Sequence, residues 1–196
     1  MVIARAVASD DTPTGSSPAA LAFVDVYQAE AGFVWRAVRG LGVGQGAIDD
    51  VVQEVFVIAY RRLPEFEGRS SVRTWLSGIL LNAVRHHRRS LLRKSPHETL
   101  REEPTDVDTL ETRARGPHEE AVAREETRLL ERVLGDLDEA KREILVLAEL
   151  EEMSAPEIAE VLGLNLNTVY SRLRLARESF EKLAARYRAH ERRRLG

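Results

Sequence analysis

The residues best suited to specific binding chemistry lie in SAPEIAEVLGLNLNTVYSRLRLAR, residues 154–177. Ser154 and Glu157 have the spacing of a capping box at the start of a helix. Gly163 can end that helix in the left-handed conformation, and Asn165 can cap the next one. A turn this short forces the two helices to cross steeply, as they do in a helix-turn-helix. The segment is therefore predicted to bind double-stranded DNA.

The second helix of this motif would place its first residues in the major groove. The candidates for contacts to base edges are Asn167, Thr168, Tyr170, Ser171 and Arg174. Arg172 and Arg177 are expected to reach phosphates. An ordinary helical hairpin with a charged face is the alternative, and any single arginine here could equally be solvated. The agreement of caps, glycine, spacing and downstream charge favours DNA binding.

A second candidate surface lies on a helix predicted to run from about Ser71 to Leu92. Residues three and four apart would share one face of it: Trp75, Gly78, Asn82, Arg85, His86 and Arg89. An aromatic ring, an amide and arginines suit single-stranded nucleic acid, because bases stack and phosphates pair with guanidinium groups. The glycine would let a backbone approach closely. The alternative is that Trp75 is simply a core residue.

A third candidate surface lies on the preceding helix, from about Ala47 to Leu63. Its face opposite the apolar stripe carries Asp50, Gln53, Glu54, Val57 and Arg61. An exposed valine beside acid and amide groups indicates a docking surface for another protein. If this helix stood alone, a solvated polar face would be the better interpretation.

Catalysis and metal binding are not expected. The adjacent His86 and His87 would point about 100° apart on a helix and could not share a metal as an i, i+4 pair can. The chain has no cysteine, which excludes thiolate metal sites, cysteine nucleophiles and disulfides and suits a reducing cytosol. No catalytic triad, phosphate loop or paired catalytic carboxylate stands out. We therefore expect no cofactor and no metal.

The elements that must position these residues are all predicted to be helices, in two small domains. Apolar residues recur at helical spacing in about residues 20–40, 47–63, 71–92 and 119–134, and in a helix capped by Asp138. The apolar stripes of the first two helices include Tyr27 and Tyr60. Pro64 and Gly68 break the chain before the third helix, which Ser71 can cap.

Charge and composition divide the chain further. The net charge of −3 hides a basic run from Arg85 to Lys94, an acidic stretch from Ser95 to Glu120 and a basic C-terminal end. We expect a disordered tail at 1–18, a first domain at 19–94, a flexible acidic linker at 95–118 and a second domain at 119–190. No apolar run approaches the roughly 20 residues of a membrane span, and a signal peptide is not expected. A cytoplasmic location follows as an expectation.

Two stretches resemble a known family. The segment DDVVQEVFVIAYRRLPEFEGRSSVRTWLSGILLNAVRHHRR, residues 49–89, resembles region two of bacterial sigma factors. The segment LDEAKREILVLAELEEMSAPEIAEVLGLNLNTVYSRLRLAR, residues 137–177, is similar to region four. A chain with only these two regions and a short linker resembles the extracytoplasmic-function (ECF) class. The resemblance implies a non-catalytic subunit that gives RNA polymerase its promoter specificity.

The resemblance also implies roles for individual residues. The face of Asp50, Gln53, Glu54 and Val57 would dock on the clamp coiled coil of the largest polymerase subunit, and region four would lie near the flap. The minus-ten element would be bound in its melted form by Phe66, Glu67, Arg69, Ser70, Asn82, Arg85 and Arg89. The recognition helix would bind the minus-35 duplex. An anti-sigma factor is a further expected partner.

This sequence departs from the family pattern in two places. Tyr170 stands where a basic residue is frequent, and Leu175 also replaces a common basic residue. Gly78 and Leu81 are unusual beside Asn82. Two other functions stay open at this point: a stand-alone regulator that binds an operator as a dimer, and a helical enzyme acting on nucleic acid. Binding of DNA without polymerase would favour the regulator, and a cluster of metal ligands would favour the enzyme.

Overall fold

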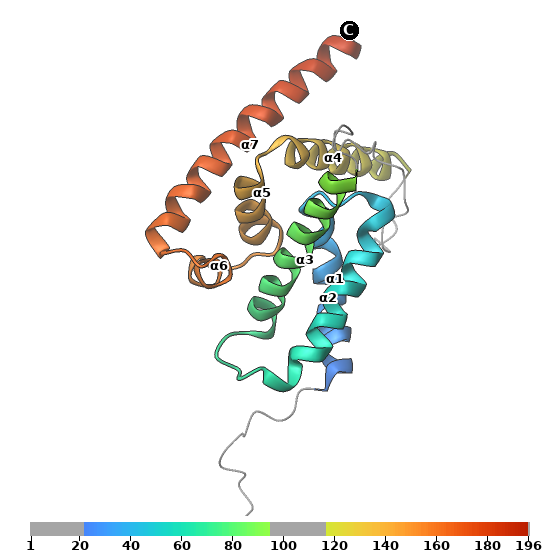
Figure 1. Cartoon of the computed structure of the whole chain (residues 1–196). Coiled ribbons are helices and arrows are strands. Elements are labelled where there is room, and N and C mark those ends of the chain that lie inside the picture. The colour runs from blue at the N-terminus through green and yellow to red at the C-terminus, as the bar shows by residue number, and fades with distance from the viewer. Residues whose placement is uncertain (1–21, 95–116, 196) are drawn as a thin grey trace, which may run out of the picture.

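The N-terminal unit is built from three helices. The computed structural model describes residues 22–94 and 117–195, so the expected tail and nearly all of the expected linker lie outside the described residues. Helices α1 (Phe23–Gly40), α2 (Ile48–Arg62) and α3 (Val72–Lys94) pack on one another, with short 3₁₀ turns at Gln45–Ala47 (η1) and Leu63–Glu65 (η2). Helix α3 lies between the α1–α2 pair and the C-terminal half of the chain (Figure 1).

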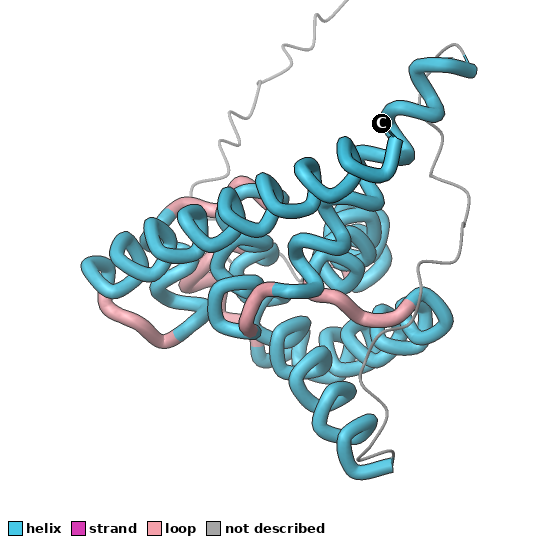
Figure 2. Tube along the Cα trace, turned by 90° about the horizontal axis from the view of Figure 1, so that it is seen from above, coloured by secondary structure: helices cyan, strands magenta, loops and turns pink. Residues whose placement is uncertain are grey.

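The C-terminal unit holds the remaining helices. Helix α4 (Pro117–Asp136) leads into α5 (Glu139–Leu145), which continues as a π-helical turn, η3 (Val146–Leu150). Helices α6 (Ala155–Leu162) and α7 (Leu166–Leu195) follow, and α7 packs on both α4 and α5. Every regular element in the described part of the chain is a helix, as the sequence predicts. Loops and turns join these helices (Figure 2).

Two helix caps form at the residues where the sequence predicts them. Ser71 Oγ accepts the amide N–H of Thr74 at 3.0 Å at the start of α3. Asp138 Oδ1 accepts the amide N–H of Lys141 at 3.0 Å, and the hydrogen bond from the Lys141 ammonium, with this backbone bond, lowers the pKa of Asp138. Each interaction satisfies backbone donors that a helix start would otherwise leave unpaired. The predicted caps at Ser71 and Asp138 are confirmed.

Two details differ from the sequence-based expectation. The apolar spacing predicts that Tyr27 and Tyr60 lie on buried stripes, but they are 48% and 63% exposed, because each lies at the edge of its stripe. Gly78 was expected to admit a close backbone approach, but a Cβ there would meet no atom within 4 Å. Helix α7 continues beyond the helix-turn-helix motif to Leu195, since no glycine or proline interrupts it.

The two units share one continuous core, which the sequence did not predict. Buried residues of α1 and α3 pack with residues of α5, η3 and α6 in a single cluster. The units pack closely at Gly40, where an added Cβ would lie 2.9 Å from Leu150 Cδ2 and 3.3 Å from Val146 Cγ2. No helix in the described part of the chain is long and apolar enough to cross a membrane.

Candidate nucleic-acid interface

The helix-turn-helix has the local geometry that its sequence predicts. The backbone N–H of Ser154 donates to Glu157 Oε2 at 2.9 Å and its hydroxyl donates to the same oxygen at 2.6 Å, which lowers the pKa of Glu157. Gly163 has a φ of 65°, the left-handed conformation that ends α6. Asn165 Oδ1 accepts the amide N–H of Thr168 at 2.8 Å and so caps α7. Val169 is fully buried and fixes α7 against the core.

The predicted base-reading residues differ in how free their side chains are. Asn167, Tyr170 and Arg172 are exposed near the start of α7. The hydroxyl of Thr168 donates to Asn165 Oδ1 at 2.8 Å, and that of Ser171 donates to the carbonyl of Thr168 at 3.0 Å. Both hydroxyls are therefore hydrogen-bonded within the first turns of α7. The larger exposed side chains are the ones that extend from the helix into solvent.

The two other arginines predicted to contact DNA, Arg174 and Arg177, have acidic partners. Arg174 pairs with Glu178 on α7 itself. Arg177 donates Nε to Glu149 Oε1 at 2.7 Å, which ties α7 to η3. Both guanidinium groups stay more than half exposed. Such exposed pairs are weak and can exchange for phosphate contacts.

On the N-terminal unit, the predicted single-strand residues do not all come together. Phe66 lies against Trp75, with ring centroids 5.1 Å apart, and both rings are half-buried. Asn82 is exposed on α3, and Arg69 pairs with Glu67 in the exposed loop before α3. Trp75 is half-buried and packs against the core, as its structural interpretation predicts.

Arg85, unlike the other residues predicted to bind the single strand, pairs with an acidic residue of the C-terminal unit. Its Nε and Nη2 donate to the two carboxylate oxygens of Glu143 on α5, at 2.7 and 2.6 Å. The hydrogen bond with Glu143 raises the pKa of Arg85 above its ordinary value. Arg89, one turn further along α3, is exposed. Arg85 and Arg89 therefore share one face of α3 but differ in their surroundings, because Arg85 is bound to Glu143 and Arg89 is exposed.

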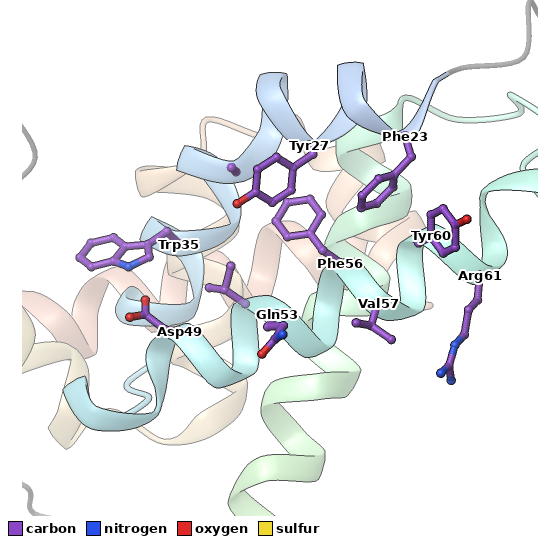
Figure 3. A pocket seen from close by; sticks show the side chains of 11 residues that line it. Phe23, Tyr27, Trp35, Asp49, Gln53, Phe56, Val57, Tyr60 and Arg61 are labelled. Atoms are coloured by element: carbon purple, nitrogen blue, oxygen red, sulfur yellow. The ribbon is translucent and has the colours of Figure 1, made fainter.

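The predicted docking face on α2 borders an open apolar groove. Asp50 and Gln53 are exposed, Val57 is 41% exposed, and Glu54 lies 3.6 Å from Nδ1 of His86. The groove has a volume of about 730 Å³ and runs between α1 and α2 (Figure 3). Its walls are mainly aromatic and aliphatic: Phe23, Tyr27, Ala31, Trp35, Val52, Phe56, Val57 and Tyr60, with Asp49, Gln53 and Arg61.

Sequence reasoning missed this groove and its aromatic cluster. The ring of Tyr27 lies 4.7 Å from that of Phe56, and the ring of Phe23 lies 5.1 Å from that of Tyr60. The signal was present in the surplus of large apolar residues on α1 and α2, which exceeds what one buried stripe accommodates. Exposed apolar surface of this kind is typical of a binding site.

Comparison with known proteins decides the family. The model of Sigma-70 region 2 matches residues 26–94, and that of Sigma-70 region 4 matches residues 127–180. The chain is 34% identical to the RNA polymerase sigma factor NccH of Alcaligenes xylosoxydans xylosoxydans, over 83% of this chain and 86% of that protein. The chain belongs to the sigma-70 family of RNA polymerase sigma factors, in the ECF class.

Further relatives agree with this assignment. The ECF sigma-E factor of Haemophilus influenzae is 33% identical over 71% of this chain and 75% of its own length. The structure of CnrH in complex with the cytosolic domain of CnrY is 29% identical, with a TM-score of 0.58, and covers 82% of this chain and 86% of that one. A Bartonella quintana sigma factor, RpoE, solved with the anti-sigma factor NepR, shares the fold at 19% identity, with a TM-score of 0.67 and coverage of 82% and 95%.

The chain is therefore a non-catalytic subunit that directs RNA polymerase in transcription initiation. Below, α1–α3 are called region two and α4–α7 region four. The family assignment selects this function over both a dimeric operator-binding regulator and an enzyme acting on nucleic acid.

Proposed function

We propose that this ECF sigma factor recognises promoters at two points, with region four on the minus-35 duplex and region two on the melted minus-ten element. The observation that carries the proposal is the row of exposed side chains on the first turns of α7, beginning after the Asn165 cap. The N-terminal end of a recognition helix enters the major groove. Asn167, Tyr170 and Arg174 are our candidates for base contacts, with Thr168 and Ser171 beside them.

Arg172 and Arg177 are proposed to hold phosphates of the same duplex. Arg172 is exposed, and Arg177 would exchange its pair with Glu149 for a phosphate oxygen. Contacts to phosphates set the position of the protein on DNA but carry no direct sequence information. The proposed region-four domain spans residues 119–190.

Region two, in the proposed span 19–94, would capture an unstacked base of the minus-ten strand. Phe66 on Trp75 offers an aromatic surface, and exposed Asn82 offers an amide. The loop that carries Glu67, Arg69 and Ser70 lies next to Phe66. Extrusion of a base costs a few kcal/mol, which stacking and phosphate contacts from arginines such as Arg85 and Arg89 offset.

We further propose that Asp50, Gln53, Glu54 and Val57 bind the clamp coiled coil of the polymerase. The support is an exposed valine set among polar groups at the rim of the aromatic groove. Apolar surface surrounded by polar residues is the usual anatomy of a protein interface. Region four would lie near the flap of the polymerase. A subunit of bacterial RNA polymerase acts in the cytoplasm, which is the location we propose.

An anti-sigma factor is a proposed regulator. The support is that a similar sigma factor, CnrH, was solved with the cytosolic domain of CnrY, and that RpoE shares the fold and was solved with NepR. Co-purification from the native cell should recover a protein that blocks transcription by this sigma factor when it is added back. Recovery of polymerase subunits alone would contradict this part of the proposal.

Run-off transcription with purified core polymerase tests the proposed function. Promoters are first located by sequencing RNA 5′ ends after overexpression, and the strongest is used as template. The full chain should start transcription there, and Tyr170→Ala should lower the yield about tenfold through the loss of about 1–2 kcal/mol of duplex binding. Glu181→Gln, an exposed change on the same helix, should leave the yield unchanged.

Two outcomes would overturn the proposal. Absence of initiation by the full chain with core polymerase would remove the promoter function itself. A Tyr170→Ala protein that keeps full yield and the same base preferences at the minus-35 position would remove the assigned role of α7.

A further inference from the structure

The first ten residues of α7 carry three of the eight large apolar side chains that are exposed in the described part of the chain. Leu166 is 41% exposed, Tyr170 is 56% exposed and Leu175 is 46% exposed. None of the three is part of the buried core, to which Val169 and Leu173 of the same turns belong. Helix α7 therefore presents apolar groups on the end that is proposed to enter the major groove.

Leu166 and Tyr170 lie side by side at the start of this helix. Because they are four residues apart, they are neighbours on the helix surface, about 6 Å apart along its axis. Leu175 lies about 140° further round the helix than Tyr170, so it faces another side. A rise of about 6 Å is close to two base-pair steps of DNA, so the pair is long enough to meet two successive base pairs.

The polar side chains beside this pair are already engaged within the protein. The hydroxyl of Thr168 donates to Asn165 Oδ1 at 2.8 Å, and that of Ser171 donates to a backbone carbonyl at 3.0 Å. Arg174 pairs with Glu178. New contacts from these polar groups require existing contacts to break, whereas an exposed leucine meets DNA with no hydrogen bond to give up.

The chemistry of a leucine restricts what it can recognise in the major groove. Its side chain neither donates nor accepts a hydrogen bond, so it has no partner among the amino, keto and ring-nitrogen groups of the base edges. The C5-methyl group of thymine is the apolar group that a base pair presents there. An exposed leucine at the start of a recognition helix therefore suits a T·A base pair, and the ring of a tyrosine one turn later offers a second apolar surface.

We propose that Leu166 and Tyr170 together recognise thymine methyl groups on neighbouring base pairs of the minus-35 duplex. The inference rests on the proposed function, because it takes α7 as the helix that enters the major groove, and it adds the chemical group that this helix reads. Leu166 is thereby a specificity-determining residue. The ring of Tyr170, rather than its hydroxyl, makes the contact. Burial of one methyl group against apolar atoms corresponds to a factor of about four in affinity.

Uracil tests the proposal, because it differs from thymine only in lacking this methyl group. The probe is a promoter duplex located by sequencing RNA 5′ ends, and it is bound by holoenzyme made from core polymerase and the full chain. Each thymine of the minus-35 element, on either strand, is replaced by uracil in turn. At one or two of these positions the affinity should fall about fourfold in a competition assay. Equal affinity at every position, or a minus-35 element without thymine, would overturn the proposal.

Variants of the two residues assign the methyl contact. The preference for thymine over uracil should fall in Leu166→Ala and in Tyr170→Ala, and it should disappear in the double variant. Tyr170→Phe keeps the ring and should keep the preference. Leu175→Ala is the matched control, since it shortens an exposed leucine on another side of the same helix. All of these changes are at exposed positions, so thermal melting should match wild type. An undiminished preference in the double variant would overturn the assignment.

The proposed function and this inference fail in different ways. If holoenzyme does not distinguish the minus-35 duplex from a scrambled one, α7 has no role in sequence recognition, and the proposed function itself fails. If holoenzyme distinguishes the two but binds thymine and uracil duplexes equally, only the methyl inference is overturned. Weaker binding of core polymerase by the double variant, together with equal binding of both duplexes, would show that Leu166 and Tyr170 contact the polymerase instead.

Discussion

Arg85 and Glu143 form a two-pronged ion pair whose members are buried to very different extents. The carboxylate side chain of Glu143 is 6% exposed, whereas that of Arg85 is 40% exposed. If the pair is broken, Arg85 can return to water but Glu143 cannot without a change in packing. Loss of the arginine should therefore cost more than loss of the glutamate.

Arg85→Ala should lower the free energy of unfolding by about 3 kcal/mol, because it leaves a buried carboxylate unpaired. Glu143→Ala should cost about 1 kcal/mol, since it leaves only an exposed cation and a small cavity. Urea denaturation of the two single variants and the double variant would measure both losses and their coupling. Arg89→Ala, an exposed change on the same helix, should stay within about 0.5 kcal/mol. Equal losses for Arg85→Ala and Glu143→Ala would contradict the argument.

Local elements of this fold could be predicted from sequence because their causes are local. A cap such as Asn165 or a left-handed glycine such as Gly163 acts within one turn of the chain, and both occur where predicted. The helix-turn-helix and its exposed residues follow from such signals together with apolar spacing. The roles of those exposed residues in DNA binding stay a prediction.

The contact between the regions could not be predicted in the same way. Glu143 and Glu151 look like surface glutamates in the sequence, yet both are buried by residues more than fifty positions away. Arg142 has both kinds of partner, because its guanidinium donates to the nearby carbonyls of Leu134, Gly135 and Leu137 at 2.6–2.8 Å and to that of the distant Leu41 at 3.1 Å. Burial lowers the pKa of Arg142. The distant partners of Glu143, Glu151 and Arg142 depend on how helices far apart in the sequence meet.

Glu151 gives a prediction about pH. Burial raises the pKa of this carboxyl, although Arg36 opposes the shift, and Oε1 has no hydrogen-bond partner. Arg73 and Glu30 are the other charged groups that act on it. A folded pKa above the unfolded value means that folding is favoured when Glu151 is protonated. This contribution is complete below the unfolded value near 4.5 and disappears as the pH rises through the folded pKa.

Glu151→Gln should therefore stabilise the chain at pH 8 by an amount on the order of 1 kcal/mol, or about 2–4 °C in melting temperature. The gain should shrink as the pH falls toward 4.5, where the wild-type carboxyl is also neutral. Thermal melting of both proteins across this pH range measures the difference. Glu152→Gln, at an exposed neighbour, should show no such dependence. A gain that is constant with pH would disprove ionisation of Glu151 as its cause.

Asn165 gives a prediction that separates stability from DNA binding. Asn165→Ala removes the acceptor for the amide of Thr168 and should cost about 1 kcal/mol of stability. Asn165→Asp should keep the cap and the stability, because a carboxylate also accepts this hydrogen bond and suits a helix N-terminus. Its charge would repel DNA phosphates, so binding of the minus-35 duplex by holoenzyme should fall severalfold. Denaturation and gel shift together would test this, and an Asn165→Asp protein that binds DNA as well as wild type would place Asn165 away from the phosphates.

Val57 offers the sharpest test of the docking face on α2. It is 41% exposed at the rim of the aromatic groove, so Val57→Glu should change the free energy of unfolding by no more than about 0.5 kcal/mol. Burial of the new carboxylate in an interface would be costly, and affinity for core polymerase should fall at least tenfold. Val24→Glu is the matched control, since Val24 is 59% exposed on α1 and does not line the groove. Fluorescence titration of labelled sigma factor with core polymerase measures both. If the two variants bind core polymerase equally well, Val57 and the groove edge that it lines are not part of the polymerase contact.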